Sequence, residues 1–291
     1  MVLPFVKMHG NGNDFIMLPL KHAYTFMQDN KLDLPFCFTS VLAQWCRTLC
    51  DRHRGIGADG VVFWAKEEGK PLQVLFVNAD GSRATTCGNA LRCLALSLKK
   101  DGVWPGITPL SVYPPEDPST PLAELLFATD DHACVSMGNC LQVFSLEPAS
   151  FVPPGVSQPP VFVQLANPHV VWLGGNFPQD FAFFEEWGKK TQELACTVWK
   201  VPLSNVGFLD VSRQKLVVYE RGAGLTLCCG SGAVAAHVAL EHLSLKDRPA
   251  PSFLELPGGN VHVKTAGDAY QLEGPAAFVF QGVLEAEEVS G

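Results

Sequence analysis

Two stretches of the sequence constrain the fold most, because each contains a β-like run, a polar loop, a Cys-Gly pair and a helical run in that order. The first begins at residues 72–77 and reaches Cys87-Gly88, and the second begins at residues 215–219 and reaches Cys229-Gly230. The two pairs lie about half the chain apart. This spacing indicates a duplicated structural unit in which each copy places one thiol at the start of a helix.

The position of Cys87 and Cys229 at helix starts suggests two reactive thiols. Unpaired backbone N–H groups and the positive end of the helix dipole favour a thiolate there. A single free cysteine is more often a buried apolar side chain, but two cysteines in matching contexts favour a functional pair. A thiolate facing a thiol can remove a proton from a carbon acid and return one to the opposite face, and this needs no cofactor.

The α-carbon of an amino acid is a weak acid, so such a site must hydrogen-bond the neighbouring carboxylate and exclude water. Helix N-termini at Gly88-Asn89 and Gly230-Ser231 supply donors. Other loops carry polar side chains for the rest of a substrate: Asn13, Asn78, Asn167, Asn205, Glu220 and Arg221. Of these, Glu220 suits an ammonium group and Arg221 a carboxylate.

Composition narrows the class of protein. The 291 residues are 47% hydrophobic and 17% charged, which predicts two domains with sizeable cores. A net charge of −8 without a cluster of Lys and Arg argues against nucleic acid and membrane surfaces as partners. Ten cysteines without a Cys-x-x-Cys motif or a secretion signal predict reduced thiols in a cytoplasmic protein, with no metal site.

Two segments resemble familiar signatures without fitting them. Residues 223–240 contain no Asp, Glu, Lys or Arg, but three glycines and a change from loop to helix predict a buried helix and not a membrane span. Residues 55–60 match G-x-G-x-x-G, but they follow a helix and precede a strand. That order is the reverse of a dinucleotide-binding motif, so no nucleotide cofactor is predicted.

Periodicity predicts four helices, at residues 41–51, 90–99, 181–194 and 233–243. Short β-like runs fill most of the remaining chain: 5–8, 16–18, 61–64, 72–77, 123–128, 133–137, 141–146, 161–165, 170–173, 206–211, 215–219, 253–256, 260–265, 270–273 and 276–284. This order predicts an α+β fold with mixed or antiparallel sheets, and it does not fit an alternating βαβ arrangement.

Eight motifs, taken together, resemble the diaminopimelate epimerase family. They occur in the order of that family and span the chain from about residue 5 to residue 285: Lys7–Phe15, 51–60, 78–82, 87–89, 167–169, Asn205, 220–224 and 229–233. The resemblance implies a cofactor-independent epimerase that interconverts LL- and meso-diaminopimelate for lysine and peptidoglycan synthesis.

The resemblance also implies an architecture. We expect two similar α/β domains, each a sheet rolled around a central helix, with the active site in the cleft between them. The first domain would comprise residues 1–130, joined by the C-terminal strand 274–291, and the second residues 131–273. Family members are commonly homodimers, so we expect a homodimer that binds a small-molecule substrate.

By the same resemblance, roles are assigned to individual residues. Cys87 and Cys229 would be the acid/base pair, with His169 and Glu220 beside the thiols to tune their protonation. The carboxylate at the reacting centre would be held by Gly88, Asn89, Gly230 and Ser231. The rest of the substrate would be held by Asn13, Asn78, Asn167, Asn205, Glu220 and Arg221.

Four positions depart from the family pattern. Ala90 and Leu91 stand where the family has Gly-Ala, so the packing of the first helix start must differ. Leu225 replaces a glutamate, and Cys228 replaces an alanine before the second cysteine. Vicinal cysteines rarely bond to each other, so we expect Cys228 to be a packed thiol.

Other functions stay open from the sequence. The chain could be another racemase of the same superfamily, such as one for proline, although Glu220-Arg221 disfavours this. It could also accept a shorter amino acid such as glutamate, or be a non-catalytic ligand-binding relative.

Overall fold

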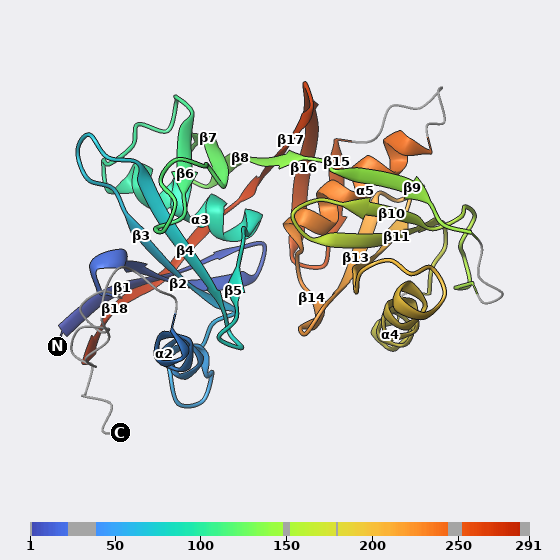
Figure 1. Cartoon of the computed structure of the whole chain (residues 1–291), viewed down its shortest axis with the longest axis horizontal. Coiled ribbons are helices and arrows are strands. Elements are labelled where there is room, and N and C mark those ends of the chain that lie inside the picture. Colours follow the sequence, from blue (N-terminus) through green and yellow to red (C-terminus); the bar gives the residue numbers. More distant parts are fainter. Residues whose placement is uncertain (1, 23–38, 148–151, 179, 244–251, 286–291) are drawn as a thin grey trace. The chain divides into compact units, whose positions relative to one another are not determined.

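The computed structural model describes residues 2–22, 39–147, 152–178, 180–243 and 252–285 (Figure 1). The chain forms two compact units: unit 1 comprises Met1–Val135 and Pro275–Gly291, and unit 2 comprises Ser136–Gly274. Each unit contains many short strands and two described helices, so the predicted α+β class is confirmed.

Unit 1 contains ten elements that lie wholly within it: β1 (Val2–Gly10), β2 (Asn13–Pro19), α2 (Ser40–Cys50), β3 (Gly60–Ala65), β4 (Leu72–Asn78), β5 (Arg83–Ala84), α3 (Gly88–Lys100), β6 (Leu110–Tyr113), β7 (Ala123–Ala128) and β18 (Ala277–Glu285). The last strand returns to the first, since β18 pairs antiparallel with β1. The C-terminal strand therefore belongs to the same sheet as the N-terminal strand.

Unit 2 repeats this series: β9 (Gln142–Ser145), β10 (Val161–Gln164), β11 (Pro168–Gly174), α4 (Phe181–Thr197), β12 (Asn205–Asp210), β13 (Lys215–Glu220), β14 (Gly224–Thr226), α5 (Gly230–His242), β15 (Phe253–Leu256) and β16 (Gly259–Ala266). The chain passes between the units within β8 (His132–Asn139) and at the end of β17 (Ala269–Pro275).

The strand pairings of the two units correspond one to one. In unit 1, β1–β2 is antiparallel, β2–β3 parallel, β3–β4 antiparallel and β4–β6 parallel. In unit 2, β10–β11 is antiparallel, β11–β12 parallel, β12–β13 antiparallel and β13–β15 parallel. The duplicated unit that the two Cys-Gly stretches predicted is present in the topology.

One helix in each unit is buried along its length. In α3, every residue from Gly88 to Leu98 is buried. Helix α5 contacts β9 to β13 and β16, and only Ser231 and the last two residues of the helix are not buried. A helix that is apolar all round must be enclosed by other elements, and here the strands of its own unit enclose it. The uncharged segment 223–240 is accordingly β14 and α5, and no described helix is long and apolar enough to cross a membrane.

The other helix of each unit is amphipathic and begins at a polar cap. Thr39 Oγ1 accepts a hydrogen bond from the Leu42 N–H at the start of α2 (3.2 Å), and Asp180 Oδ1 accepts one from the Ala182 N–H at the start of α4 (2.9 Å). Helix α4 contacts β12, which α5 also contacts, and all residues of β12 are buried. The two helices therefore cover opposite faces of this strand.

Helix α4 approaches β13 closely at Gly188. An added Cβ at Gly188 would lie 2.6 Å from Tyr219 Cβ and 2.8 Å from Tyr219 Cδ1. Tyr219 is on strand β13, one residue before Glu220, so its Cβ cannot move away without shifting the strand. The helix thus depends on this glycine to reach the sheet.

We predict that Gly188→Ala destabilises the protein. In a helix interior this change usually stabilises by about 0.5–1 kcal/mol, but overpacking against Tyr219 should reverse the sign and cost about 1–3 kcal/mol. Urea unfolding would measure the difference, with Glu193→Ala on the exposed face of α4 as the control. A Gly188→Ala protein as stable as the wild type would contradict the close contact.

Candidate functional site

Cys87 and Cys229 occupy the same structural position in their units. Each is the N-cap residue of a 13-residue helix, α3 or α5, with φ/ψ of −146°/112° for Cys87 and −114°/107° for Cys229. Neither side chain caps its own helix by a hydrogen bond. Both thiols therefore lie at the positive end of a buried helix, as the sequence predicted.

The surroundings of Cys229 are created by the turn between β13 and β14. This antiparallel pair aligns Glu220 with Gly224, and the turn includes Gly222 and Gly224, both with positive φ. Cys229 Sγ donates a hydrogen bond to Glu220 Oε2 (3.0 Å), and Thr226 Oγ1 donates to the other oxygen, Oε1 (2.7 Å). The carboxylate is thus held between a hydroxyl and the thiol.

The protonation of Cys229 differs from the expectation that a helix N-terminus favours a thiolate. Burial raises the pKa of Cys229 well above the ordinary thiol value, and the neighbouring Glu220 carboxylate raises it further. Hydrogen bonds from Ser231 and the Gly232 N–H act in the opposite direction but are smaller effects. The expectation is therefore wrong for Cys229, because loss of water and a nearby negative charge outweigh the helix end.

Three further candidates of unit 2 lie together beside Glu220. Asn205 Oδ1 accepts a hydrogen bond from the Arg221 N–H (2.9 Å), and Arg221 Nη2 donates to Asn167 Oδ1 (3.2 Å). Asn205 is buried, whereas Arg221 is exposed. Asn205 therefore fixes the backbone of this turn, and Asn167 orients the guanidinium.

His169 is adjacent to Asn205 on the neighbouring parallel strand and is almost completely buried. Among the described residues, no group hydrogen-bonds its Nε2 atom. Burial, followed by the charge of Arg221, lowers the pKa of His169 to about 3. The imidazole is therefore neutral at physiological pH.

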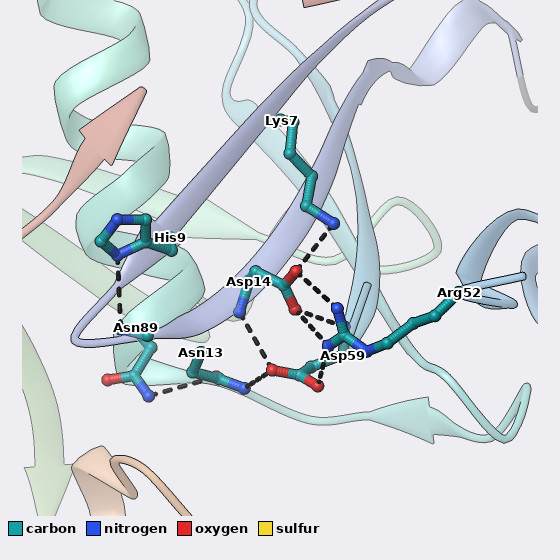
Figure 2. Close-up of polar contacts among 8 residues, drawn as sticks. Lys7, His9, Asn13, Asp14, Arg52, Asp59 and Asn89 are labelled. Atoms are coloured by element: carbon teal, nitrogen blue, oxygen red, sulfur yellow. Dashed lines mark hydrogen bonds and ion pairs between the residues drawn. The ribbon is translucent and has the colours of Figure 1, made fainter. Parts of the chain in front are cut away.

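The candidates of unit 1 form a second group around the start of α3. Asn89 Nδ2 donates to Asn13 Oδ1 (3.1 Å), and Asn13 Nδ2 donates to Asp59 Oδ2 (2.8 Å), as Figure 2 shows. At the other end, Arg92 Nη2 donates to Asn89 Oδ1 (3.0 Å). These contacts connect the helix that carries Cys87 to strand β2 and to the segment before β3.

A network of four charged side chains holds this group in place (Figure 2). Arg52 contacts both carboxylates, at 2.8 Å from Asp14 Oδ1 and 2.8 Å from Asp59 Oδ1, and the buried Lys7 ammonium lies 2.8 Å from Asp14 Oδ2. Burial alone would raise the pKa of Asp14, but the hydrogen bonds and charges of Arg52 and Lys7 outweigh it and hold that pKa well below its usual range. Asp14 therefore stays ionised at all ordinary pH values.

Sequence reasoning gave no role to Lys7, Asp14, Arg52 or Asp59, or to Arg92 and Thr226. They lie in or next to the motifs that resemble the family, and this proximity is the signal in the sequence that could have identified them. Their partners are too distant in sequence to be read from spacing: 45 residues separate Asp14 from Asp59, and 38 separate Asp14 from Arg52.

The remaining candidates are placed less tightly. Asn78 ends β4 opposite Gly60, and its exposed side chain donates to Ser82 Oγ (2.9 Å). Gly88 and Gly230 are the first residues of α3 and α5, and Ser231 Oγ lies 3.6 Å from Cys229 Sγ. The structure thus assembles two groups of predicted residues, one in each unit.

The departures from the family pattern are accommodated by packing. Ala90, Leu91 and Cys228 are buried, so Cys228 is a packed thiol, as expected. Leu225 packs against an aromatic cluster that includes Trp187 and Phe184 of α4. An apolar side chain in this position thereby extends the interface between β14 and α4.

The fold defines a class of protein. It matches the solved structure of a predicted epimerase from Pseudomonas aeruginosa with a TM-score of 0.70 at 14% identity, covering 98% of this chain and 100% of the other. It also matches a hydroxyproline epimerase from Agrobacterium vitis with a TM-score of 0.60 at 11% identity, covering 97% and 91%. The chain therefore has the fold that these epimerases share.

Sequence comparison gives the particular family. The family model for diaminopimelate epimerase matches residues 5–106. A diaminopimelate epimerase of Acidiphilium cryptum is 31% identical over 300 residues, covering 97% of this chain and 96% of the relative. One from a Synechocystis strain is 33% identical over 309 residues, covering 98% and 100%. The chain belongs to the diaminopimelate epimerase family, and the resemblance inferred from its motifs is confirmed.

We predict that Glu220→Gln lowers the pKa of Cys229, because it removes the negative charge that stabilises the protonated thiol. The value should remain above the ordinary 9.0, since burial persists. The pH dependence of alkylation by iodoacetamide, followed by mass spectrometry, would measure it. The measurement would use a Cys228→Ala background, so that Cys229 is the only thiol in the proteolytic peptide that contains it.

Glu193→Gln provides the matched control, since Glu193 is an exposed carboxylate on α4 of the same unit. It should leave the titration of Cys229 unchanged. If Glu220→Gln also left the alkylation midpoint unchanged, the contact between Glu220 and the thiol would not control its protonation.

Proposed function

We propose that this protein epimerises LL-diaminopimelate to meso-diaminopimelate without a cofactor, and that Cys87 and Cys229 are its acid/base pair. The observation that carries the proposal is the matched position of the two thiols, each at the N-cap of the buried helix of its unit, in a chain of this family. Relatives named diaminopimelate epimerase align with this chain over 96% and 100% of their own length, and this supports diaminopimelate as the substrate.

The chemistry requires one base and one acid. Cys229, whose raised pKa keeps its proton on sulfur, is suited to the acid. Cys87 as a thiolate would take the α-proton on one face while the Cys229 S–H delivers its proton to the other face. The carbon loses one proton and gains one, and the charge moves from Cys87 to Cys229. In the reverse direction the two residues exchange roles.

The carbanion that forms between these steps needs stabilisation of the adjacent carboxylate. The backbone N–H groups at Gly88, Asn89, Gly230 and Ser231 lie at the positive ends of α3 and α5 and suit this purpose. The neutral His169 adds no charge that would compete with the thiols. Glu220 accepts the hydrogen bond of Cys229 and is placed to relay its proton.

The far end of the substrate needs polar contacts that do not react. Arg221 is exposed and oriented by Asn167, so it suits the second carboxylate. Asn13 and Asn78 would contribute from unit 1. Asn205, which is buried and bound to the Arg221 backbone, would act by fixing that turn. For this division of roles, the two units would be the functional domains.

Incubation of reduced protein with LL-diaminopimelate in D₂O tests the reaction. We expect deuterium at one α-carbon and appearance of the meso isomer, followed by NMR and chiral chromatography. Cys87→Ala and Cys229→Ala should each lower the rate by at least about 10²–10⁴-fold, the usual contribution of a general acid or base. Neither added metal nor nucleotide should be required.

Cys196→Ala is the control for these variants, since Cys196 is an exposed thiol on α4 outside the proposed site. It should keep full activity. Absence of exchange and of meso product with wild-type protein would refute the proposed substrate. Exchange with proline or glutamate in its place would assign a different racemase activity.

A homodimer in the cytoplasm fits this proposal. Strand β18 exposes three apolar side chains, Val279 (52%), Phe280 (48%) and Val283 (59%), on unit 1. Sedimentation velocity should give a dimer mass, and the Val279→Lys/Val283→Lys double variant should shift it to the monomer. Ile107→Lys, at another exposed apolar position of unit 1, should not. A wild-type monomer at micromolar concentration would refute the dimer.

A further inference from the structure

We propose that Asp59 is a positioning residue that sets the direction of the Asn13 and Asn89 amides beside Cys87. This inference rests on the proposed function, because it assigns a role in substrate binding at the same site. It concerns a residue to which neither the motifs nor the family resemblance assigned a task. Figure 2 shows Asp59 between the Arg52 guanidinium and the Asn13 amide.

Three hydrogen bonds form a directed chain. Arg92 Nη2 donates to Asn89 Oδ1 (3.0 Å), Asn89 Nδ2 donates to Asn13 Oδ1 (3.1 Å), and Asn13 Nδ2 donates to Asp59 Oδ2 (2.8 Å). Arginine can only donate hydrogen bonds, and an ionised carboxylate can only accept them. The chain therefore begins at a pure donor and ends at a pure acceptor.

These two ends determine which way the amides point. If both amides turned over, they would keep a hydrogen bond to each other. However, Asn89 would then direct an N–H group at Arg92, and Asn13 would direct a carbonyl oxygen at Asp59. Both contacts would be repulsive. Only one orientation of the pair satisfies both ends, whereas two polar but neutral ends would leave two orientations close in energy.

Both ends are themselves held rigidly. Arg92 is fully buried, and its Nη2 atom also donates to Asn11 Oδ1 (2.6 Å). Asp59 Oδ2 also accepts the Asp14 N–H (3.0 Å), and Asp59 Oδ1 accepts Arg52 Nη2 (2.8 Å). Because Arg52 also binds both oxygens of Asp14, at 3.0 and 2.8 Å, the Asp59 carboxylate has little freedom to rotate.

Asp59 is connected to the other candidates of unit 1 through its backbone. Its carbonyl oxygen accepts the Ala79 N–H (3.0 Å), next to Asn78, and its own N–H donates to the Asp14 backbone and side chain (2.9 and 3.0 Å). Asn89 is the second residue of the helix that Cys87 caps. One residue thus ties together three segments that carry proposed substrate contacts.

The consequence concerns binding of an anion. A substrate carboxylate accepts hydrogen bonds, so an amide must present N–H to it and not a carbonyl oxygen. An amide nitrogen carries two N–H groups, and Asn13 uses one of them on Asp59. With the direction fixed by Asp59, the second N–H of Asn13 is preorganised for the ligand. Loss of the fixed direction should weaken substrate binding more than the proton-transfer step.

The test is a double-mutant cycle between Asp59→Asn and Asn13→Ala, with LL-diaminopimelate as substrate. Asp59→Asn keeps the shape but removes the obligate acceptor. We expect kcat/KM to fall by about 10- to 100-fold, mostly through KM. In the Asn13→Ala background, the same change should cost less than about twofold, because the amide through which Asp59 acts is gone. Additive effects would overturn the proposal.

Two controls separate positioning from stability. Asp130→Asn removes a carboxylate of unit 1 that pairs with Lys99 at the surface, and it should change neither KM nor the unfolding midpoint. Asp59→Ala serves as a second variant with no acceptor at all, and it should show the same non-additivity with Asn13→Ala. A loss of activity that only followed a loss of folded protein would refute a positioning role.

An NMR readout distinguishes failure of this proposal from failure of the proposed function. In wild-type protein the side-chain NH₂ signals of Asn13 and Asn89 should be dispersed and protected from solvent exchange. Asp59→Asn should shift both sets, although Asn89 does not touch Asp59 directly. If the wild type turned over no diaminopimelate but both sets of signals shifted, the directed chain of hydrogen bonds would be supported and the proposed substrate would be wrong. If the Asn89 signals did not move, the coupling of Asn89 to Asp59 through Asn13 would be refuted.

Discussion

Each unit of this protein is organised around a helix that is buried on every side, and the start of that helix is where polar chemistry can occur. Along α3 and α5 most of the buried side chains are apolar or small, with polar exceptions such as Arg92 in α3 and His237 in α5. The first turn differs, because its N–H groups have no partner within the helix. The two cysteines and four of the proposed ligands, Gly88, Asn89, Gly230 and Ser231, lie at these two helix starts.

Both helix starts have an N-cap cysteine with an extended backbone, but their surroundings differ. In unit 2 a carboxylate from the β13–β14 turn accepts the thiol proton, so burial and charge together keep Cys229 neutral. In unit 1 the side-chain amides of Asn89, in the first turn of α3, and of Asn13 are aligned between Arg92 and Asp59. A repeated fold thus presents a carboxylate beside the thiol in one unit and a directed pair of amides in the other. Such a difference suits a reaction in which one thiol gives a proton while the other takes one.

Departures from the family pattern are understandable from packing. Leu225 extends the aromatic cluster under α4, and Gly188 in that helix allows the approach to Tyr219. Tyr219 immediately precedes Glu220 on β13. The aromatic core of unit 2 therefore packs against the strand that carries the carboxylate.

The sequence by itself determined the duplicated unit, the α+β class, the two cysteines at helix starts and the family. These features depend on local patterns: apolar runs of strand length, glycines in turns and a Cys-Gly pair before a helical run. Element boundaries were less certain, since α4 continues to Thr197, three residues beyond its predicted end.

Only the tertiary structure decided the protonation of Cys229 and His169 and the role of Asp59. The pKa values depend on burial and on charges brought close by folding, and in the case of Cys229 these reversed what the helix end alone predicts. The directed chain of hydrogen bonds joins Asn89 to Asn13 and Asn13 to Asp59, pairs that are 76 and 46 residues apart in the sequence. No local pattern encodes such contacts, because they exist only once β2, α3 and the segment before β3 have packed together.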